Sequence, residues 1–498
     1  MEVEFKKTTI PCLEVRLWEV QNSEQTLEIK LSEGMPEVGS VVAAWGQVVL
    51  RGKQWQADRI RLSGGVMVWV LYAPEDGSQP RTIEGWMPFQ MHWDLPPECR
   101  EGTIRVATRI RGIDARPVSA RRILVRAGVG AMAQALGPCE AEVYSPQEES
   151  CQVELLKKCY PLTLMKEAGE KAFLLEEELT LPESAPGLDS LVYCRLEPKI
   201  LEQKVLGDKL VFRGSGCCHI LYRCREGQLH SWEFQLPFSH YAELTQTHST
   251  QAQSQVLMEL TALEPEVSEG RLRMKGAVTA QYLITDRQLL ELTEDAYLPG
   301  QDTTAKVQLL EIPSVLDQRI LTQEISQQVS ARADVLVDSL FLPDFPMAHS
   351  MPEGVQLELS GSFQTLYYQQ GGSLRSVNTP WQAEQKLAAG DNTQLMVLPC
   401  QGEARGELHG ENLSLEAQLL LQVDAVASQQ LPMVTGVELG QCRPWDPSRP
   451  SVILRRAGEE SLWDIAKAND TRVETIRKAN GLEEEPDPQQ ILLIPVGL

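Results

Sequence analysis

A cluster of cysteine and histidine side chains in the middle of the chain could bind zinc. It comprises Cys217, Cys218, His219, Cys224 and His230. Zinc requires four ligands that converge in a tetrahedron, and proteins usually supply them as close pairs such as CxxC or HxxxH. On a β-strand, Cys217 and His219 would point to one side, and Cys218 and Cys224 to the other. We therefore expect ordinary buried thiols and no metal site.

A glycine pattern at residues 128–133, GVGAMA, matches the GxGxxA motif of dinucleotide-binding proteins. In that role the glycines lie between a strand and a helix whose N-terminus binds phosphate. Two later segments of similar sequence, GAVTAQY at 276–282 and AQLLLQV at 417–423, alternate like strands and lack those glycines. We therefore expect a strand and no cofactor. The sequence also holds no nucleophile elbow, P-loop or HExxH motif, so we expect no catalytic residues and no enzyme.

Composition limits the classes of protein to which the chain can belong. The 498 residues carry a formal net charge of −23, which argues against binding to nucleic acid or to an anionic membrane. No run approaches the ~20 apolar residues of a membrane-spanning helix, so no membrane insertion is expected. The start, MEVEFKKTT, has no apolar stretch typical of a secretion signal, and the 11 cysteines show no regular spacing. We therefore expect a cytoplasmic protein with reduced thiols.

Arginines are concentrated between residues 100 and 126, where only Glu101 and Asp114 oppose them. They are Arg100, Arg105, Arg109, Arg111, Arg116, Arg121, Arg122 and Arg126. Such a strip could bind an acidic partner or an acidic region of the same chain. Alternating arginines are also typical of a strand face exposed to solvent. The sequence leaves these alternatives open.

Three segments resemble one another at a domain-sized spacing: residues 58–89, 208–238 and 355–381. Each contains a tyrosine, then a turn glycine and then a proline followed by an aromatic residue, and the tyrosines are Tyr72, Tyr222 and Tyr367. Apolar and polar residues alternate on both sides of the turn, as in β-hairpins. The repeat predicts a mainly β multidomain chain of three tandem β-rich repeat domains, 1–145, 146–300 and 301–428. The tyrosines should occupy equivalent packing positions.

The end of the chain has a different pattern. A proline-rich linker is expected at 429–450, and residues 451–498 predict a small α+β domain in the order βααβ. Its strands are expected at residues 452–455 and 491–494. The pairs Ser461 with Asp464 and Thr471 with Glu474 predict two N-terminal helix caps, and Asn480-Gly481 predicts the end of the second helix.

This tail resembles the LysM domain through Gly458, Ser461-Leu462-Trp463, Ile465-Ala466, Asn480 and residues 491–495. The resemblance implies a groove for N-acetylglucosamine glycans between the loops 458–462 and 482–490. The candidate glycan- or partner-binding residues are Gly458, Glu459, Glu460, Ser461, Leu462, Trp463, Pro488, Gln489 and Gln490. Trp463 is either a half-exposed anchor for a partner or a residue that packs against the final strand.

The order of domains resembles that of the SipL-like spore coat morphogenetic proteins, in which tandem SPOCS-family domains precede a C-terminal LysM domain. The resemblance rests on the repeated glycine, Leu-Tyr, glycine and Pro-aromatic pattern, followed by the LysM motif. It implies a non-catalytic scaffold in the cytoplasm of the mother cell, at the forespore surface. It also implies binding to the morphogenetic ATPase of the coat basement layer through the LysM and β repeat domains. The alternative is a protein that binds peptidoglycan through its LysM domain.

Overall fold

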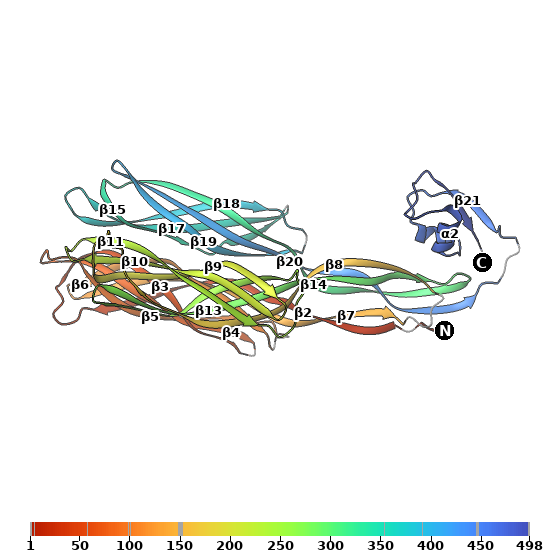
Figure 1. Ribbon diagram of the computed structural model, residues 1–498, viewed down its shortest axis with the longest axis horizontal. Coiled ribbons are helices and arrows are strands. Elements are labelled where there is room, and N and C mark those ends of the chain that lie inside the picture. The colour runs from red at the N-terminus through yellow and green to blue at the C-terminus, as the bar shows by residue number, and fades with distance from the viewer. Residues whose placement is uncertain are drawn as a thin grey trace.

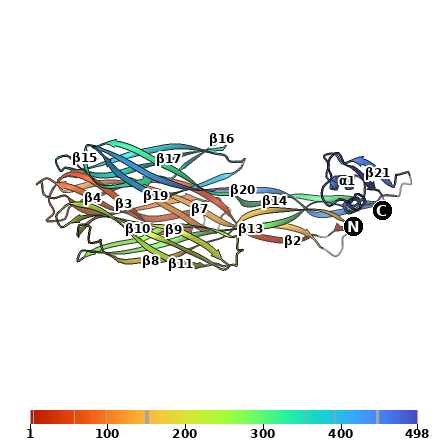
Figure 2. The same ribbon diagram turned by 45° about the horizontal axis from the view of Figure 1, so that its top comes forward.

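The computed structural model describes residues 2–496, except residues 4, 57, 98, 100, 148–152, 353, 391 and 445–447. Within them the chain is mainly β-structure and ends in a small α+β domain, which confirms the predicted fold class. The molecule is elongated, with three β-rich repeats at one end and the small C-terminal domain at the other (Figure 1). A narrow stem of long strands joins the two ends, as both ribbon views show (Figures 1 and 2).

Each repeat has a long first strand, a group of intermediate strands and a long last strand. The first repeat consists of β2 (Phe5–Lys30), β3 (Val38–Gln56), β4 (Arg59–Pro74), β5 (Arg81–Asp94), β6 (Thr103–Ser119) and β7 (Arg122–Pro146). The second consists of β8 (Glu154–Leu179), β9 (Leu188–Leu206), β10 (Lys209–Cys224), β11 (Leu229–Glu243), β12 (Gln253–Ser268) and β13 (Arg271–Tyr297). The third consists of β14 (Gln301–Ser330), β15 (Ala333–Pro343), β16 (Met347–Met351), β17 (Gly354–Gln369), β18 (Leu374–Leu387), β19 (Gln394–His409) and β20 (Asn412–Cys442).

The first and last strands of each repeat pair antiparallel along nearly their whole length: β2 with β7, β8 with β13, and β14 with β20. The next-to-last strand, β6, β12 or β19, extends this sheet on the side of the last strand. The intermediate strands form sheets of their own, such as β3-β4-β5 and β9-β10-β11. Buried residues of both sheets share one core in the first repeat, which makes the repeat a two-layer sandwich.

The three repeated tyrosines occupy equivalent positions in the sheets. Tyr72 pairs with Val41 and Arg81, Tyr222 with Leu191 and His230, and Tyr367 with Leu336 and Arg375. All three side chains are buried. The hydroxyls of Tyr72 and Tyr222 donate to carbonyl oxygens at matching positions, those of Pro36 at 3.1 Å and Pro186 at 3.0 Å. The tyrosines are therefore packing residues, as predicted.

The repeated glycine has a steric reason. In the first two repeats it pairs across the sheet with the aromatic residue of the Pro-aromatic motif, Gly64 with Phe89 and Gly214 with Phe238. A Cβ atom on Gly214 would lie 2.6 Å from the Phe238 ring and 2.0 Å from the carbonyl oxygen of Lys199. The ring therefore covers a backbone that admits no side chain, an arrangement known from other sheets.

The three repeats pack against one another. Trp45 and Trp69 of the first repeat pack on Tyr193 of the second, with ring centroids 5.5 and 5.3 Å apart. In the stem, one apolar core gathers residues of all three strand pairs: Cys12, Ala141, Val143, Leu162, Leu164, Leu290, Leu292, Leu310, Ile312, Leu431 and Met433. Burial of this apolar surface holds the three strand pairs together.

The predicted linker at 429–450 needs a correction. Residues 429–442 are the second half of β20, which pairs with β14 as far as Cys442. The pairing is interrupted by a register shift between Lys306 and Val307, and the adjacent residues Met433 and Val434 are both buried. This bulge breaks the alternation by which a strand is recognised in sequence. Residues 445–447 of the linker lie outside the described part of the chain, and the predicted domain boundaries stay predictions.

Substitution Gly214→Ala tests the steric role of the repeated glycine. We expect it to lower the free energy of unfolding by about 1–3 kcal/mol, because the new methyl group forces the Phe238 ring or the Lys199 backbone to move. Urea unfolding followed by circular dichroism measures the change. The matched control is Gly187→Ala in the same repeat, where the nearest atom would lie 3.9 Å from the added Cβ. Equal stability of the two variants would contradict the explanation.

Candidate functional site

The C-terminal domain contains the predicted candidate residues. It consists of β21 (Val452–Arg456), α1 (Leu462–Ala468), α2 (Val473–Asn480) and β22 (Ile491–Pro495), in the predicted order. The two strands pair antiparallel, and the helices cover one face of the ribbon through a core that includes Leu462, Ile465 and Ile476. Residues 497 and 498 of the predicted domain lie outside the described residues.

Two of the three predicted helix signals are confirmed. The backbone N–H of Asp464 donates to Ser461 Oγ at 3.1 Å, which caps α1. Gly481 adopts a left-handed φ of 63° and ends α2. The cap predicted at Thr471 is wrong: α2 begins after Arg472, and no side chain caps it. Thr471 is buried, and its carbonyl oxygen accepts a hydrogen bond from Tyr297 of the second repeat at 2.8 Å.

The structure brings the two predicted loops together. The Gly458 N–H donates to the Pro488 carbonyl at 3.0 Å, and the Leu462 N–H donates to Glu485 Oε2 at 2.9 Å. Gly458 has a φ of 69°, a conformation that favours glycine. Of the candidate residues, Leu462 and Trp463 are buried and Ser461 and Gln490 are half-buried, whereas the exposed ones are Gly458, Glu459, Glu460, Pro488 and Gln489.

The loops are acidic. They carry Glu459, Glu460, Glu483, Glu484, Glu485 and Asp487. Arg455 pairs with Glu460, and Arg456 donates to Gln489 at 3.2 Å. An acidic rim repels polyanions and accepts neutral or basic ligands.

Trp463 contacts the second repeat and is not a half-exposed anchor, since only 7% of its surface is exposed. Its ring meets that of Tyr297 edge to face, with centroids 4.8 Å apart. Its indole N–H donates to Asp295 Oδ2 at 2.9 Å, and Lys467 Nζ lies 2.6 Å from the same oxygen. Burial acts to raise the pKa of Asp295, but the hydrogen bonds from Lys467 and Trp463 outweigh it and hold that pKa below its ordinary value. Helix α1 is therefore docked on the end of β13.

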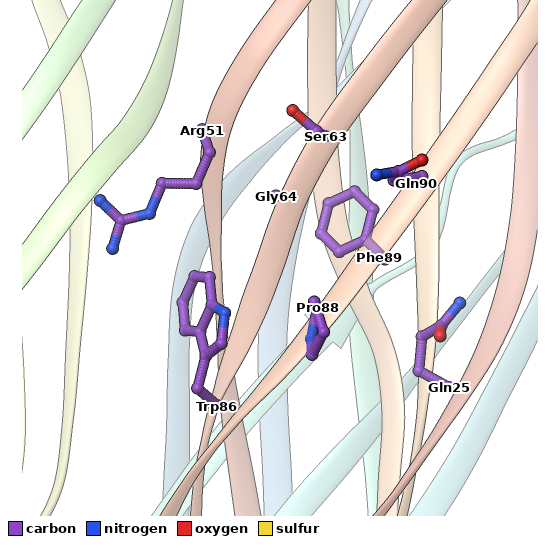
Figure 3. A pocket seen from close by; sticks show the side chains of 8 residues that line it. All are labelled: Gln25, Arg51, Ser63, Gly64, Trp86, Pro88, Phe89 and Gln90. Atoms are coloured by element: carbon purple, nitrogen blue, oxygen red, sulfur yellow. The ribbon is translucent and has the colours of Figure 1, made fainter.

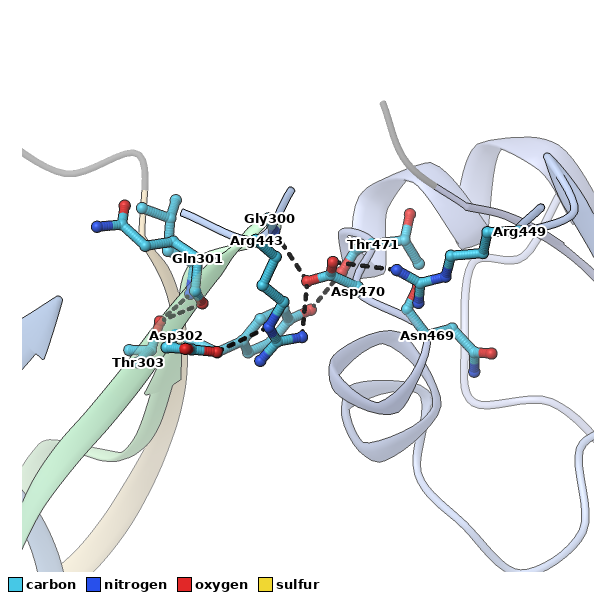
Figure 4. Close-up of polar contacts among 11 residues, drawn as sticks. Gly300, Gln301, Asp302, Thr303, Arg443, Arg449, Asn469, Asp470 and Thr471 are labelled. Atoms are coloured by element: carbon cyan, nitrogen blue, oxygen red, sulfur yellow. Dashed lines mark hydrogen bonds and ion pairs between the residues drawn. The ribbon is translucent and has the colours of Figure 1, made fainter. Parts of the chain in front are cut away.

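Asp470 provides a second contact between the C-terminal domain and the stem (Figure 4). Its carboxylate accepts from the Gly300 N–H at 2.8 Å and from Arg449 at 3.2 Å. Arg443, at the end of β20, lies 3.5 Å from Asp470 and 2.8 Å from Asp302. A carboxylate with this many donors holds the turn before α2 on the loop between β13 and β14.

The outer face of the β21–β22 ribbon is apolar and exposed. Side chains that alternate with the core residues point away from the helices. Leu454 is 68% exposed and Ile491 64%, and Val452 and Leu493 are also exposed. We call these residues the ribbon patch: Val452, Leu454, Ile491 and Leu493. The ribbon lies at the end of the molecule opposite the three sandwiches (Figure 1). Clustered exposed apolar side chains are typical of interaction surfaces.

The other sequence features lie in the sandwiches. The glycine pattern at 128–133 is part of strand β7. Cys218 and Cys224 are buried, Cys217 is half-buried, and His219 Nε2 lies 2.9 Å from Asp338 Oδ1 of the third repeat. Among the described residues, no three His, Cys, Asp or Glu side chains converge as metal ligands would.

The arginines between residues 100 and 126 follow both alternatives, since some contact another part of the same chain and others face solvent. Arg109 donates to the Pro399 carbonyl, and Arg111 lies 2.6 Å from Asp344, both in the third repeat. Arg116 and Arg126 face solvent. Arg100 lies outside the described residues.

The repeated glycines also border shallow surface hollows. In the first repeat, Gly64, Phe89 and Trp86 line one such hollow together with Arg51 (Figure 3). Gly214, Pro237 and Phe238 line its counterpart in the second repeat. The guanidinium of Arg51 lies 5.1 Å from the centroid of the Trp86 ring. Both hollows lie where an aromatic ring covers the repeated glycine, so the packing shared by the repeats explains them.

Sequence reasoning missed the residues of the repeats that contact the C-terminal domain. Asp295, Tyr297 and Gly300 lie at the end of the second repeat and carry no motif. Only Trp463 gave a signal, since a large aromatic residue on a short helix needs a partner. The partner of Trp463 belongs to the same chain because the stem brings the end of the second repeat to the LysM domain. No local sequence pattern predicts the stem.

Comparison with protein families supports two of these assignments. Residues 189–264 match the family described as SipL, SPOCS domain, and residues 457–495 match the LysM domain. No curated protein and no solved structure matches the chain. The chain thus carries a SPOCS domain in the second repeat and a C-terminal LysM domain, as the resemblance predicted. Both are binding domains without catalytic function, and they fit a sporulation-related scaffold or a peptidoglycan-binding role. No helix in the described residues has the length and apolar character to cross a membrane.

Removal of the Tyr297 ring should release the LysM domain. We expect Tyr297→Ala to speed hydrogen exchange in α1 and at Gly300 by roughly tenfold or more, since tenfold corresponds to about 1.4 kcal/mol of lost docking. Exchange measured by mass spectrometry on the full chain reports both sites. Tyr241→Ala removes a tyrosine that is 50% exposed in the same repeat, and it should leave α1 unchanged. Equal exchange rates of α1 in the wild-type chain and in Tyr297→Ala would show that other contacts hold the domain.

The same contact should depend on pH through Asp295. Because the pKa of Asp295 is lowered in the folded protein, its contribution is present above the ordinary value of about 4 and is lost as pH falls through the lowered pKa. We expect exchange of α1, corrected for the intrinsic rate, to rise below about pH 4 before the sandwiches unfold. Asp295→Asn should remove this pH dependence. If wild type and Asp295→Asn respond alike to acid, Asp295 is not the group that titrates.

Proposed function

We propose that this protein is a non-catalytic scaffold of spore coat assembly that binds the morphogenetic ATPase of the coat basement layer. The observation that carries the proposal is the presence of a SPOCS domain and a LysM domain in one chain. The partner comes from the resemblance to the SipL-like proteins. A scaffold of this kind would act in the cytoplasm of the mother cell, at the forespore surface.

The ribbon patch supports a role of the LysM domain in protein binding. Its four apolar side chains are exposed at the tip of an elongated molecule, where a large partner can reach them. The opposite face of the domain, with Trp463, is occupied by Tyr297 and Asp295 of the same chain. A partner would therefore bind the ribbon patch or the loops and leave α1 in place. Exposed leucine and isoleucine side chains provide the apolar centre of such interfaces.

A second candidate function is binding of N-acetylglucosamine glycans, favoured by the exposed loops at 458–462 and 482–490. The hydrogen bonds between Gly458 and Pro488 and between Leu462 and Glu485 hold the loops side by side, as a groove requires. The acidic rim favours neutral sugars over anionic cell-wall polymers. The proposed site for glycan is thus distinct from the ribbon patch.

A charge placed in the ribbon patch should separate the two functions. We expect Leu454→Glu in the full chain to weaken capture of the purified ATPase by roughly 30-fold, the loss of about 2 kcal/mol typical of a central interface residue. Its fold should be unchanged, because Leu454 is 68% exposed. Leu174→Glu is the matched control, since Leu174 is 71% exposed on the second repeat. Biolayer interferometry measures both affinities.

Chitin oligomers titrated into the same variants provide the other half of the test. Submillimolar binding that survives Leu454→Glu but is lost in Gln489→Ala would favour the glycan function. Absence of glycan binding together with a Leu454-dependent ATPase complex would favour the scaffold. Equal ATPase binding by Leu454→Glu and Leu174→Glu would contradict a role of the ribbon patch.

A further inference from the structure

A cavity of about 470 Å³ lies where the three repeats meet. Its walls come from β3 and β6 of the first repeat, β9 and β12 of the second, and β14, β19 and β20 of the third. The LysM domain takes no part in it, and the hollow at Gly214 adjoins it only through Leu201. Its volume falls in the range of small-molecule sites, about 300–1,000 Å³.

Side chains hold the two sides of this cavity together. The strands β6 and β12 are the two edges of one six-stranded sheet, β12-β13-β8-β2-β7-β6. The Gln281 amide accepts from the Val106 N–H at 2.9 Å and donates to its carbonyl at 2.8 Å. The Glu259 carboxylate accepts from the Thr108 N–H at 3.0 Å and from its hydroxyl at 2.6 Å. The edges therefore face each other across a gap bridged by side chains.

Two guanidinium groups, those of Arg105 and Arg109, line the cavity beside the buried carboxylate of Glu259. Arg105 is 2% exposed and donates to Gln134 at 2.8 Å, and Arg109 donates to the Pro399 carbonyl. The Nε atoms of both arginines are buried, and within the described residues neither Nε atom has a hydrogen-bond partner. Nearby Asp424 is bonded to Gln255 and Gln318 instead. The Glu259 carboxylate accepts from Thr108 and leaves both Nε atoms unbonded. A buried donor without an acceptor is costly, so the site favours an anion that accepts from these two Nε atoms.

The remainder of the wall is apolar and leads to the surface. Val256, Leu257, Leu398 and Leu420 lie along it. At the surface, Leu201 and Ile320 are 75% and 70% exposed, although both belong to the lining. An aliphatic chain placed along these side chains would be removed from water at a gain of about 0.8 kcal/mol for each buried CH₂ group.

We propose that this cavity binds a small amphipathic anion, with its anionic head at Arg105 and Arg109 and its aliphatic chain along the leucine wall. Carboxylate and phosphate heads both suit a guanidinium pair. Because all three repeats contribute to the cavity, the bound molecule would stabilise their association. The proposal is independent of the LysM domain and of the proposed scaffold function.

The test is titration of decanoate into the full chain by calorimetry, with thermal melts in parallel. We expect decanoate to raise the melting temperature and to bind at least tenfold more tightly than decanol, which lacks the charge. Arg109→Gln should remove this difference, whereas Arg116→Gln, an exposed arginine of the same strand, should keep it. Leu257→Trp retains both arginines and fills the apolar wall, and should abolish binding of decanoate and decanol alike.

Decyl phosphate and inorganic phosphate distinguish the heads. Tighter binding of decyl phosphate than of decanoate would support the same site with a phosphate head. Equal binding of inorganic phosphate and decyl phosphate would overturn the role of the apolar wall. Equal affinity for decanol and decanoate, binding that persists in folded Leu257→Trp, or no binding to the wild-type chain would overturn the proposal.

Discussion

The pairing of the first strand of each repeat with the last is the interaction on which the remaining structure depends. It closes each repeat, since β2, β8 and β14 find their partners only after the whole repeat has been traversed. The paired strands extend beyond the sandwiches, and their extensions meet in the stem core. The stem in turn places the end of β13 where α1 of the LysM domain can dock. The binding domain is thereby held at a fixed place by strands that begin in the sandwiches.

Local sequence patterns predicted much of this structure. The tyrosine, glycine and Pro-aromatic signals each correspond to a fixed register position. The glycine is required because a side chain at Gly64 or Gly214 would overlap the ring of Phe89 or Phe238. In the LysM domain the strands, the cap at Ser461 and the glycine that ends α2 are local features, and they are found where the sequence predicts them. Two expectations were wrong because packing at a distance decided them. The bulge near Val434 hid the end of β20, and the contact of Thr471 with Tyr297 replaced a helix cap.

The position of the LysM domain changes how its residues can act. Trp463, the most prominent candidate in the sequence, is committed to an intramolecular contact, and so is the buried carboxylate of Asp470. The acidic pair of loops and the ribbon patch remain available to other molecules. The sequence could not separate these sets, because exposure of Leu454 and burial of Trp463 both depend on which face of a small domain meets the stem. The sequence motif therefore predicts which residues belong to the candidate site, whereas docking of the domain on the stem determines which of them are exposed.

The long strand pairs also determine the order in which the chain can fold as it is synthesised. Phe5 pairs with Pro146, so β2 has no native partner until the first repeat has left the ribosome. During that interval its edge can pair with any other extended strand, including one from a neighbouring nascent chain. Each repeat shortens this exposure by closing upon itself, and the stem core forms only when β20 arrives. A truncated chain that ends before β20 would thus leave β14 without its partner along its full length, which is a direct route to aggregation.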